Sequence, residues 1–453
     1  MELAADKRRQ PFSGYFHCDA FVEDAELTHT GRGTPCGELM RKYWQPICLS
    51  QELTDLPRLI RVLGEDLVVF RDRSNRIGLV HRSCPHRGTS LEFGKPSERG
   101  IRCCYHGWLI DIDGSILETP NESPTSRLKE TVVHGAYPAL EERGIVFAYL
   151  GPPDLKPPFP VIETYGTAVE DCVPFSVRQP CNWLQCHENN MDPMHAPFLH
   201  ASVSGVQLTP AFGVIPVVNY VETEGGAGMH YISVRRTKAD RVWIRFQYVL
   251  APNYTDIPSP MEEGIKVKYG QRTAWNRWTV PNDDVNCTMF GWRYLRPGLD
   301  AGRADRSKIG RGALDAAAYQ DEDHRSYEEK QREPGDWVAQ VAQGPIAIHA
   351  REHLGASDTG VAMWRRLVRR AVRGEGLGAV PPGLDGRSPD IWSLASDTVL
   401  AIPRRSADGE TGFLRNVGKQ VFDCVAAAGK YNGPYTEEPL KAKLRSLEAK
   451  LQG

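Results

Sequence analysis

The fold of this chain is decided by two short stretches, Cys84-Pro85-His86 and Cys103-Cys104-Tyr105-His106-Gly107-Trp108, which are sixteen residues apart. Each stretch carries a cysteine and a histidine close together, and each has a nearby glycine that lets the backbone turn tightly. Together the two loops offer two thiolates and two imidazoles. This donor set indicates a metal centre.

The donor set is that of a Rieske [2Fe–2S] cluster, in which two histidines replace two cysteines on one iron. A zinc site is the alternative, but zinc sites usually pair like ligands or leave longer gaps between histidines. The Cys-x2-His spacing favours Cys103 over Cys104 as the ligand, so we expect Cys104 to be a small apolar residue beside the cluster. Imidazole ligands raise the cluster potential, so it should pass single electrons to a stronger acceptor.

Composition restricts the class of protein without naming it. The 453 residues, of which 41% are hydrophobic and 25% charged, suit two or three globular domains. The net charge of −2 gives no reason to expect nucleic acid or a membrane surface as a partner. No stretch approaches the roughly 20 apolar residues of a spanning helix, and eleven cysteines do not indicate a disulfide framework. We therefore expect a cytoplasmic protein.

Strand and turn patterns predict a small all-β domain over residues 45–155. Residues 59–70 resemble paired strands, the Asp-Gly pair within 111–115 predicts a hairpin turn, and 144–150 resembles a further strand. A proline-rich connector follows at 156–160. We expect an N-terminal segment (1–44) that packs with the catalytic domain, the small domain (45–155) and a larger catalytic domain (156–453).

The larger part shows mixed strand and helix patterns. Residues 231–235 and 242–248 alternate like half-buried strands. A helix is expected to start after Asp358 and end near Gly374, with an apolar stripe at Val361, Trp364, Leu367 or Val368, and Ala371. Its other face carries Arg365, Arg366, Arg369, Arg370 and Arg373, which we expect to be solvated, although they could dock an acidic partner. Leucines at 440, 444, 447 and 451 predict a seam that packs on the body or on another subunit.

A second group of potential ligands lies in residues 182–200. Asp192-Pro193 predicts a helix start, with Asp192 and His195 on one face of the first turn. His200 follows five residues later, and Pro197 could bend the segment so that both imidazoles converge on one metal. With one carboxylate they would form the 2-His-1-carboxylate triad of non-heme iron sites. Two unconnected histidines are the alternative.

These motifs together resemble the oxygenase α subunit of Rieske non-heme iron ring-hydroxylating enzymes, of the phthalate dioxygenase and aryl O-demethylase type. The resemblance rests on Cys-x-His-x16-Cys-x2-His followed by Glu-x3-Asp-x2-His-x4-His. Further matching stretches are Gly37–Pro46, Trp278–Asp284, Gly344–Ile346 and Arg351–Asp358. It implies a small Rieske domain joined to a catalytic domain with an antiparallel sheet and helices in a helix-grip, that is, an α+β fold.

The resemblance also assigns residues. It implies the cluster ligands Cys84, His86, Cys103 and His106. The mononuclear iron would be held by His195 and His200, with Asp336 as the carboxylate; Asp321, Asp323 and Asp358 are the alternatives. Asp192 matches a carboxylate that bridges an iron-site histidine to a Rieske histidine of the neighbouring subunit. Glu188 is expected to support the site from behind the ligands, and His187 has no expected role.

By the same resemblance, a reductase, with or without a ferredoxin, passes electrons from NADH to the cluster and on to the ferrous site, where O2 is used to oxidise the substrate. The implied assembly is a homotrimer or a dimer of trimers. The implied substrate is an aromatic, carboxylated compound. The motifs do not distinguish dihydroxylation, monohydroxylation and O-demethylation.

Two other functional classes are possible. The first is an electron-transfer Rieske protein without oxygenase activity; such proteins resemble one another in having a disulfide between the cluster loops, but here the first loop continues Arg87-Gly88-Thr89-Ser90 with no cysteine. The second is a degenerate family member that serves only as a scaffold. Three iron atoms per chain would indicate the oxygenase, and two a pure electron carrier. For the substrate carboxylate, Arg235, Arg236 and Arg245 lie on expected strands, although strand arginines usually face water.

Overall fold

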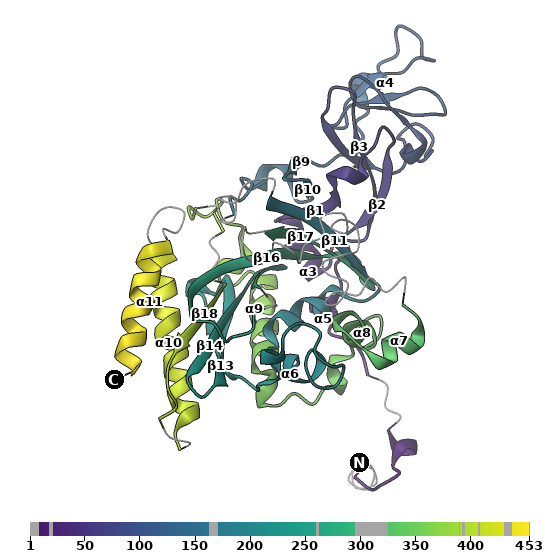
Figure 1. Ribbon diagram of the computed structural model, residues 1–453. Coiled ribbons are helices and arrows are strands. Elements are labelled where there is room, and N and C mark those ends of the chain that lie inside the picture. Colours follow the sequence, from purple (N-terminus) through teal and green to yellow (C-terminus); the bar gives the residue numbers. More distant parts are fainter. Residues whose placement is uncertain are drawn as a thin grey trace.

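The computed structural model describes residues 9–17, 21–162, 171–259, 262–294, 325–388, 390–391, 395–405, 408–429 and 437–452. A small unit of short antiparallel sheets projects from one end of a larger unit of sheet and helices (Figure 1). The expected α+β class is therefore confirmed.

Short strands build the small unit. Three of its sheets have the strand orders β1-β10-β9, β2-β3-β4 and β5-β6-β7-β8. The strands are β1 (Trp44–Leu49), β2 (Arg58–Val62), β3 (Glu65–Arg71), β4 (Ile77–His81), β5 (Lys95–Pro96), β6 (Ile101–Arg102), β7 (Leu109–Ile110), β8 (Ile116–Glu118), β9 (Ala139–Glu142) and β10 (Ile145–Tyr149). The expected paired strands, hairpin turn and strand at 144–150 correspond to β2–β3, the β7–β8 turn and β10.

One antiparallel sheet of eight strands organises the larger unit, in the order β11-β17-β16-β15-β14-β13-β12 with β18 paired to both β14 and β16. The strands are β11 (Cys172–Gln179), β12 (Val217–Glu222), β13 (Gly228–Lys238), β14 (Arg241–Leu250), β15 (Tyr254–Pro258), β16 (Lys268–Asp283), β17 (Asn286–Tyr294) and β18 (Ser396–Ala401). Both expected strands, 231–235 and 242–248, lie inside β13 and β14.

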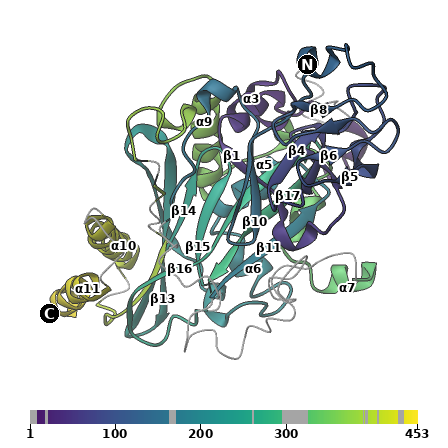
Figure 2. The same cartoon turned by 90° about the horizontal axis from the view of Figure 1, so that it is seen from above.

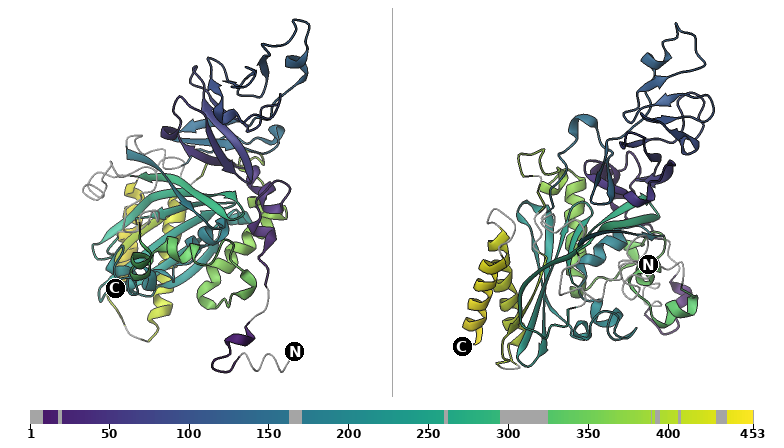
Figure 3. Two further views of the ribbon diagram at one scale, coloured as in Figure 1. Left: turned by 90° about the vertical axis from the view of Figure 1, so that its right-hand side faces the viewer. Right: turned by 45° about the horizontal axis from the view of Figure 1, so that its top comes forward.

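Two long C-terminal helices, α10 (Glu410–Gly429) and α11 (Glu437–Gln452), cover one face of this sheet (Figure 3). Alternate residues of β13 and β14, such as Ile232 and Ile244, pack there against apolar residues of both helices. Leu440, Leu444 and Leu451 of the expected seam are buried in the same cluster. The seam thus packs on the body of its own chain.

The opposite face is covered by shorter helices, and Figure 2 shows α10 and α11 on one side of the strands and α5 and α9 on the other. The remaining helices are α2 (Ala25–Thr28), α3 (Pro35–Arg41), α4 (Leu128–Thr131), α5 (Trp183–Glu188), α6 (Ala196–Leu199), α7 (Tyr327–Arg332), α8 (Asp336–Val341) and α9 (Thr359–Val372). Short 3-10 turns include η7 (Asn189–Met191), η8 (Pro210–Gly213), η12 (His349–Arg351) and η13 (Ala356–Asp358). In the described parts of the chain, no helix combines the length and apolar character needed to cross a bilayer.

Helix α9 begins after Asp358 and buries the expected apolar stripe, including both Leu367 and Val368. The expectation that its arginine face is solvated is wrong for Arg365 and Arg369, whose side chains are 12% and 29% exposed; the other three arginines are exposed, although two of them also form ion pairs. Arg365 pairs with Glu188 and Glu352, Arg369 with Asp24 and Glu26, Arg370 with Glu222, and Arg373 with Glu26. These arginines are therefore used inside the chain, where they fix α9 to α2 and to the end of α5.

Candidate functional site

The two cluster loops, residues 84–88 and 103–107, lie after β4 and between β6 and β7. The Gly88 N–H donates to Cys84 O at 2.8 Å, and the Gly107 N–H donates to Cys103 O at 3.1 Å. Both glycines have a positive φ, of 77° and 74°, which side-chain-bearing residues rarely adopt. Each loop is therefore a tight turn that starts at a buried cysteine.

The four expected cluster ligands meet at the end of these loops. The imidazole rings of His86 and His106 have their centroids 4.5 Å apart, and His86 stacks on Trp108 at 5.0 Å. Burial raises the pKa of the Cys84 thiol to about 11, and the neighbouring Cys103 adds to this, whereas backbone N–H groups of His86 and Arg87 act in the opposite direction. Two paired cysteines, two adjacent imidazoles and N–H donors aimed at a sulfur suit a Rieske cluster.

Cys104, the neighbour of the expected ligand Cys103, is exposed, whereas Cys103 is buried. Cys104 is therefore not a buried apolar residue, and its expected place beside the cluster stays a prediction.

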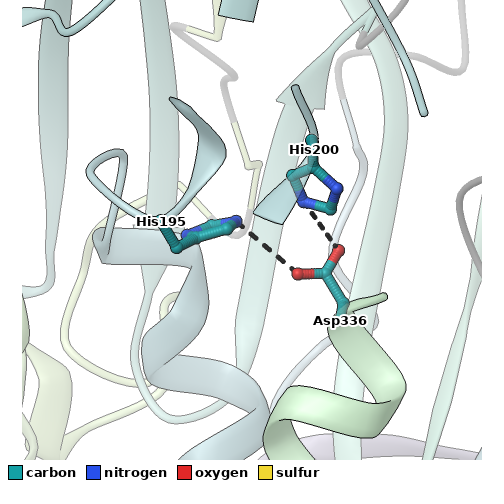
Figure 4. A group of neighbouring side chains, drawn as sticks. All are labelled: His195, His200 and Asp336. Atoms are coloured by element: carbon teal, nitrogen blue, oxygen red, sulfur yellow. Dashed lines mark ion pairs between the residues drawn. The ribbon is translucent and has the colours of Figure 1, made fainter. Parts of the chain in front are cut away.

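The second group lies on the segment that follows α5. The expected helix start at Asp192-Pro193 is wrong, because Asp192 ends the η7 turn and α6 begins at Ala196. Instead, Asp192 Oδ1 accepts the Met194 N–H at 2.9 Å and so stabilises a turn. His195 and His200 lie at the two ends of α6, which brings both rings to the same side (Figure 4).

Asp336, the first residue of α8, faces both rings (Figure 4). His195 Nε2 lies 3.5 Å from Asp336 Oδ1, and His200 Nε2 lies 3.4 Å from Asp336 Oδ2. One atom from each residue lies within 4.8 Å of the others, which suits a single metal ion. Of the alternative carboxylates, Asp321 and Asp323 lie outside the described residues, and Asp358 instead accepts the Gly355 N–H at 2.7 Å.

The outer ring nitrogens are already engaged. His195 Nδ1 lies 2.5 Å from the Asp192 carbonyl oxygen, and His200 Nδ1 lies 2.9 Å from Gln207 Oε1. Because a carbonyl oxygen only accepts, each Nδ1 carries the proton, which leaves each Nε2 free to bind a metal. This is the arrangement that metal-ligating histidines usually show. The three residues therefore fit a mononuclear iron site.

The charge of Asp336 also fits a mononuclear iron site. Burial alone would raise the pKa of Asp336, but His200, His195 and Arg277 outweigh it and hold this pKa well below its ordinary value. Burial lowers the pKa of His200, yet Asp336 raises it overall. Asp336 is thus a carboxylate at neutral pH, as a ligand of Fe(II) must be.

Glu188 does not face these residues. It is 7% exposed, and its two oxygens each accept from Arg365 at 2.7 Å. Glu188, His349 and Glu352 also lie close enough to hold an ion, but the Arg365 guanidinium pairs with both carboxylates and supplies the cation there. His187, which had no expected role, is buried, and its Nδ1 lies 3.1 Å from Thr279 Oγ1.

The three strand arginines are buried, so the expectation that they face water is wrong. Arg236 pairs with Glu410, and Arg245 pairs with Asp397. Arg235 has no carboxylate partner among the described residues; it donates to Val214 O and Ser233 Oγ and lies over the rings of Phe212 and Trp243. Burial lowers the pKa of Arg235 to about 10.

Two residues that contact the iron-site side chains were missed from the sequence. Asn189 Nδ2 donates to Asp336 Oδ1 at 3.1 Å, and Gln207 both accepts from His200 and donates to Pro334 O at 2.8 Å. Asn189 stands inside the Glu-x3-Asp motif and could have been considered there. Nothing in the spacing of Gln207 indicates its contact, because a loop brings it back to His200.

Comparisons with known proteins agree with both centres. Residues 43–134 match the family described as the Rieske [2Fe-2S] domain, and residues 180–374 match the vanillate O-demethylase oxygenase C-terminal domain. The second match lies where a pure electron carrier would have no counterpart, so the electron-transfer alternative has no support.

Full-length relatives share both parts. The oxygenase subunit of the tert-butanol monooxygenase / tert-amyl alcohol desaturase of Aquincola tertiaricarbonis is 44% identical, over 99% of each chain. The α subunit of phenoxybenzoate dioxygenase of Ectopseudomonas oleovorans is 37% identical, over 81% of this chain and 89% of the relative.

A solved structure of dicamba monooxygenase bound to dicamba has the same fold, with a TM-score of 0.51 and 17% identity over 74% of this chain and 97% of that one. The chain therefore belongs to the oxygenase subunits of the multicomponent Rieske oxygenases, which carry a Rieske [2Fe–2S] cluster and a mononuclear non-heme iron.

Proposed function

We propose that His195, His200 and Asp336 hold the mononuclear iron of this oxygenase, and that Cys84, His86, Cys103 and His106 hold its Rieske cluster. The observation that carries the first assignment is the convergence of both Nε2 atoms on one carboxylate, with both Nδ1 atoms held by oxygen acceptors. When bound, the cluster supplies single electrons and the ferrous ion supplies open coordination positions for O2. The chain supplies ligand orientation through Asp192 O, Gln207 and Asn189.

Asp192 is proposed to connect the two centres. Its Oδ2 lies 3.6 Å from His195 Nδ1, and its side chain is 25% exposed. Burial would raise the pKa of Asp192, but His195 lowers it below the ordinary value, so the group is an acceptor at neutral pH. A partly exposed carboxylate beside an iron-site histidine can also accept from a cluster histidine of a neighbouring copy. Glu188, through Arg365, is proposed to hold α5 and α9 in place behind this segment.

The assembly proposed is a homotrimer or a dimer of such trimers. In Figure 1 the small β unit projects from the top of the molecule, whereas α6 and α8 lie in its lower part, and this separation supports electron transfer between copies. Both ends expose apolar side chains: Phe93 and Tyr105 near the cluster loops, and Phe198, Val203 and Val206 near α6. A closed ring of head-to-tail contacts would cover both sets. A monomer that keeps full turnover in sedimentation and activity measurements would contradict this.

The proposed substrate is an aromatic, carboxylated compound. Arg235 supports the carboxylate, because a buried guanidinium that has no acidic partner among the described residues is costly until an anion pairs with it. It contacts Phe212 and Trp243, which form one apolar cluster with Ala196, the residue after His195. A small tertiary alcohol is a second candidate, favoured by the 44% identity to the tert-butanol monooxygenase subunit.

Electrons are proposed to come from NADH in the cytoplasm through a separate reductase, with or without a ferredoxin. We expect a surrogate reductase to support substrate-dependent O2 uptake with aryl carboxylates or methoxybenzoates, and mass analysis of the products to identify the reaction type. Uptake with tert-butanol but with none of the acids would reject the carboxylate. Uptake with none of the substrates, although three iron atoms are bound, would reject the oxygenase activity for these classes.

The role of Asp192 is tested separately with the pre-reduced Asp192→Asn variant, whose amide oxygen can still accept the Met194 N–H and so keep the turn. We expect both metal centres to be loaded and single-turnover oxidation to be slowed at least roughly tenfold, since the charged acceptor of the connection is removed. A single-turnover rate equal to that of the parent would reject this role.

A further inference from the structure

The short turn between α5 and the iron-site histidines touches two of the three proposed iron ligands. At its start, Asn189 Nδ2 donates to Asp336 Oδ1 at 3.1 Å. At its end, the Asp192 carbonyl oxygen lies 2.5 Å from His195 Nδ1. A shift of this turn would therefore displace both the carboxylate and one imidazole.

Asn190, between these two contacts, ties the turn to the sheet. Its side chain is 2% exposed. Its Oδ1 accepts from Arg277 Nη2 at 2.7 Å and from Gln247 Nε2 at 3.2 Å, and its Nδ2 donates to His187 O at 2.6 Å. Gln247 in turn accepts from the Tyr231 hydroxyl at 2.8 Å. One amide thus connects the turn to strands β13, β14 and β16.

The amide can act only in this orientation. Its oxygen faces two N–H donors, one of them on a guanidinium, and its nitrogen faces a carbonyl oxygen, so a flipped amide would lose all three hydrogen bonds. A hydrocarbon side chain of the same size would remove one hydrogen bond each from Arg277, Gln247 and His187 O, and bonds to charged groups are the stronger ones. Asn190 therefore adds directional hydrogen bonds to the apolar packing of Met191, which is buried in the same turn.

We propose that Asn190 is a positioning residue for the mononuclear iron: it fixes the turn from which Asn189 holds Asp336 and Asp192 O holds His195. The inference rests on the proposed ligand set. It makes Gln247 and Arg277, residues of the sheet, indirect supports of the iron site, and it assigns neighbouring asparagines different tasks, one toward the ligand and one toward the sheet.

The test compares Asn190→Leu with Asn253→Leu. Asn253 is equally buried, and its amide donates to Gln45 Oε1 and Thr279 O, which lie outside the turn of residues 189–192. We expect Asn190→Leu to weaken Fe(II) binding at the mononuclear site about 10- to 100-fold, as loss of outer partners does, and to change the electron paramagnetic resonance signal of its ferrous–nitrosyl adduct. The Rieske signal should not change. Asn253→Leu should lower the thermal midpoint but keep parental Fe(II) affinity and the parental nitrosyl signal.

Parental affinity and an unchanged nitrosyl signal in Asn190→Leu would overturn the inference, as would a parallel loss of iron in both variants, which would reflect general destabilisation. If Asn190→Leu does not fold, Gln247→Met removes a single bond to the amide and should weaken Fe(II) binding severalfold in the same direction; parental affinity there would also overturn it. A parent chain that binds two iron atoms instead of three would reject the proposed ligand set itself, and no substrate is needed for any of these measurements.

Discussion

The two metal centres of this chain are built in different ways. The two cluster loops, which are tight turns, supply all four expected cluster ligands within the 23 residues from Cys84 to His106. The iron site takes two histidines from α6 and a carboxylate from the start of α8, 136 residues beyond His200. Its ligands are then held by Asn189, Gln207 and a main-chain carbonyl.

The two centres differ in whether local or tertiary contacts determine the positions of their ligands. In the cluster loops, positive-φ glycines and loop hydrogen bonds give the ligands their positions locally. At the iron site, the geometry depends on the packing of α5, α6 and α8 against the large sheet. A change distant in sequence should therefore disturb the iron more than the cluster, and each centre should be removable without the other.

The largest effect is expected at the cluster. Cys103→Ala should abolish the cluster, its visible absorption and all reductase-driven turnover, because the remaining cysteine of the loop, Cys104, is exposed and out of the Cys-x2-His spacing. Iron content should fall from three atoms per chain to one, measured by a colorimetric iron assay. Cys104→Ala, the matched control, should keep all three, since Cys104 is exposed. Loss of the cluster in the Cys104 variant instead would reverse the ligand assignment.

Asp336→Ala should remove the mononuclear iron and leave the cluster in place. We expect Fe(II) affinity to fall by more than roughly 100-fold, since loss of an outer partner alone costs about 10- to 100-fold. Iron content should be two atoms per chain, with an unchanged Rieske spectrum and no substrate oxidation. Asp358→Ala should retain all three. An Asp336 variant that keeps its third iron would direct attention to Asp321 or Asp323.

Gln207→Leu should have a smaller effect of the same kind. It removes the acceptor of His200 Nδ1–H, so Fe(II) affinity should fall about 10-fold while the ligands remain. Titration with Fe(II) of the protein depleted of mononuclear iron measures this. Ser202→Ala loses a hydroxyl bond to Pro197 O in the same loop and should leave the affinity unchanged. Equal losses in the two variants would indicate that the loop, and not the hydrogen bond, matters.

The smallest effect is expected at His230, which lies outside both centres between Tyr248 and Phe422. Burial lowers the pKa of His230 to about 3. In the unfolded chain His230 would bind a proton below about pH 6.5, whereas in the folded chain it does not. The contribution of His230 therefore lowers the free energy of unfolding as the pH falls from about 6.5 toward 3. This free energy falls by up to about 1.4 kcal/mol per pH unit.

His230→Phe should therefore raise the thermal midpoint more at pH 5 than at pH 7.5, while iron content and turnover stay parental. A difference between variant and parent that does not grow toward acid pH would show that His230 is not kept neutral in the folded chain.

The strands, the β7–β8 turn and the apolar stripe of α9 could be predicted from the sequence, because side-chain periodicity and turn residues close by determine them. The domain boundaries at residues 45 and 156 stay a prediction, as does every assignment of a ligand to a metal.

The sequence was insufficient where tertiary contacts override local preference. Asp192-Pro193 has the pattern of a helix start, yet Asp192 stabilises a turn and the helix begins at Ala196. Arg365 and Arg369 of α9 have the pattern of a solvated face, but Glu188 of α5 and Glu26 of α2 pair with them. The second error arises because the acidic partners are far away in sequence, where periodicity carries no information. The first arises because the Asp192 side chain can stabilise a turn as well as a helix start, and its spacing to Met194 does not distinguish the two.

The main chain and the side chain of Asp192 have different proposed roles, so substitutions at this residue can separate them. Its carbonyl oxygen orients His195, whereas its carboxylate is the group proposed to connect the two centres. Substitution alters only the side chain, so every replacement at residue 192 that preserves the turn retains the orienting carbonyl. Variants at this single position can therefore report on electron delivery without confusing it with metal loading, a separation that substitutions at His195 cannot provide.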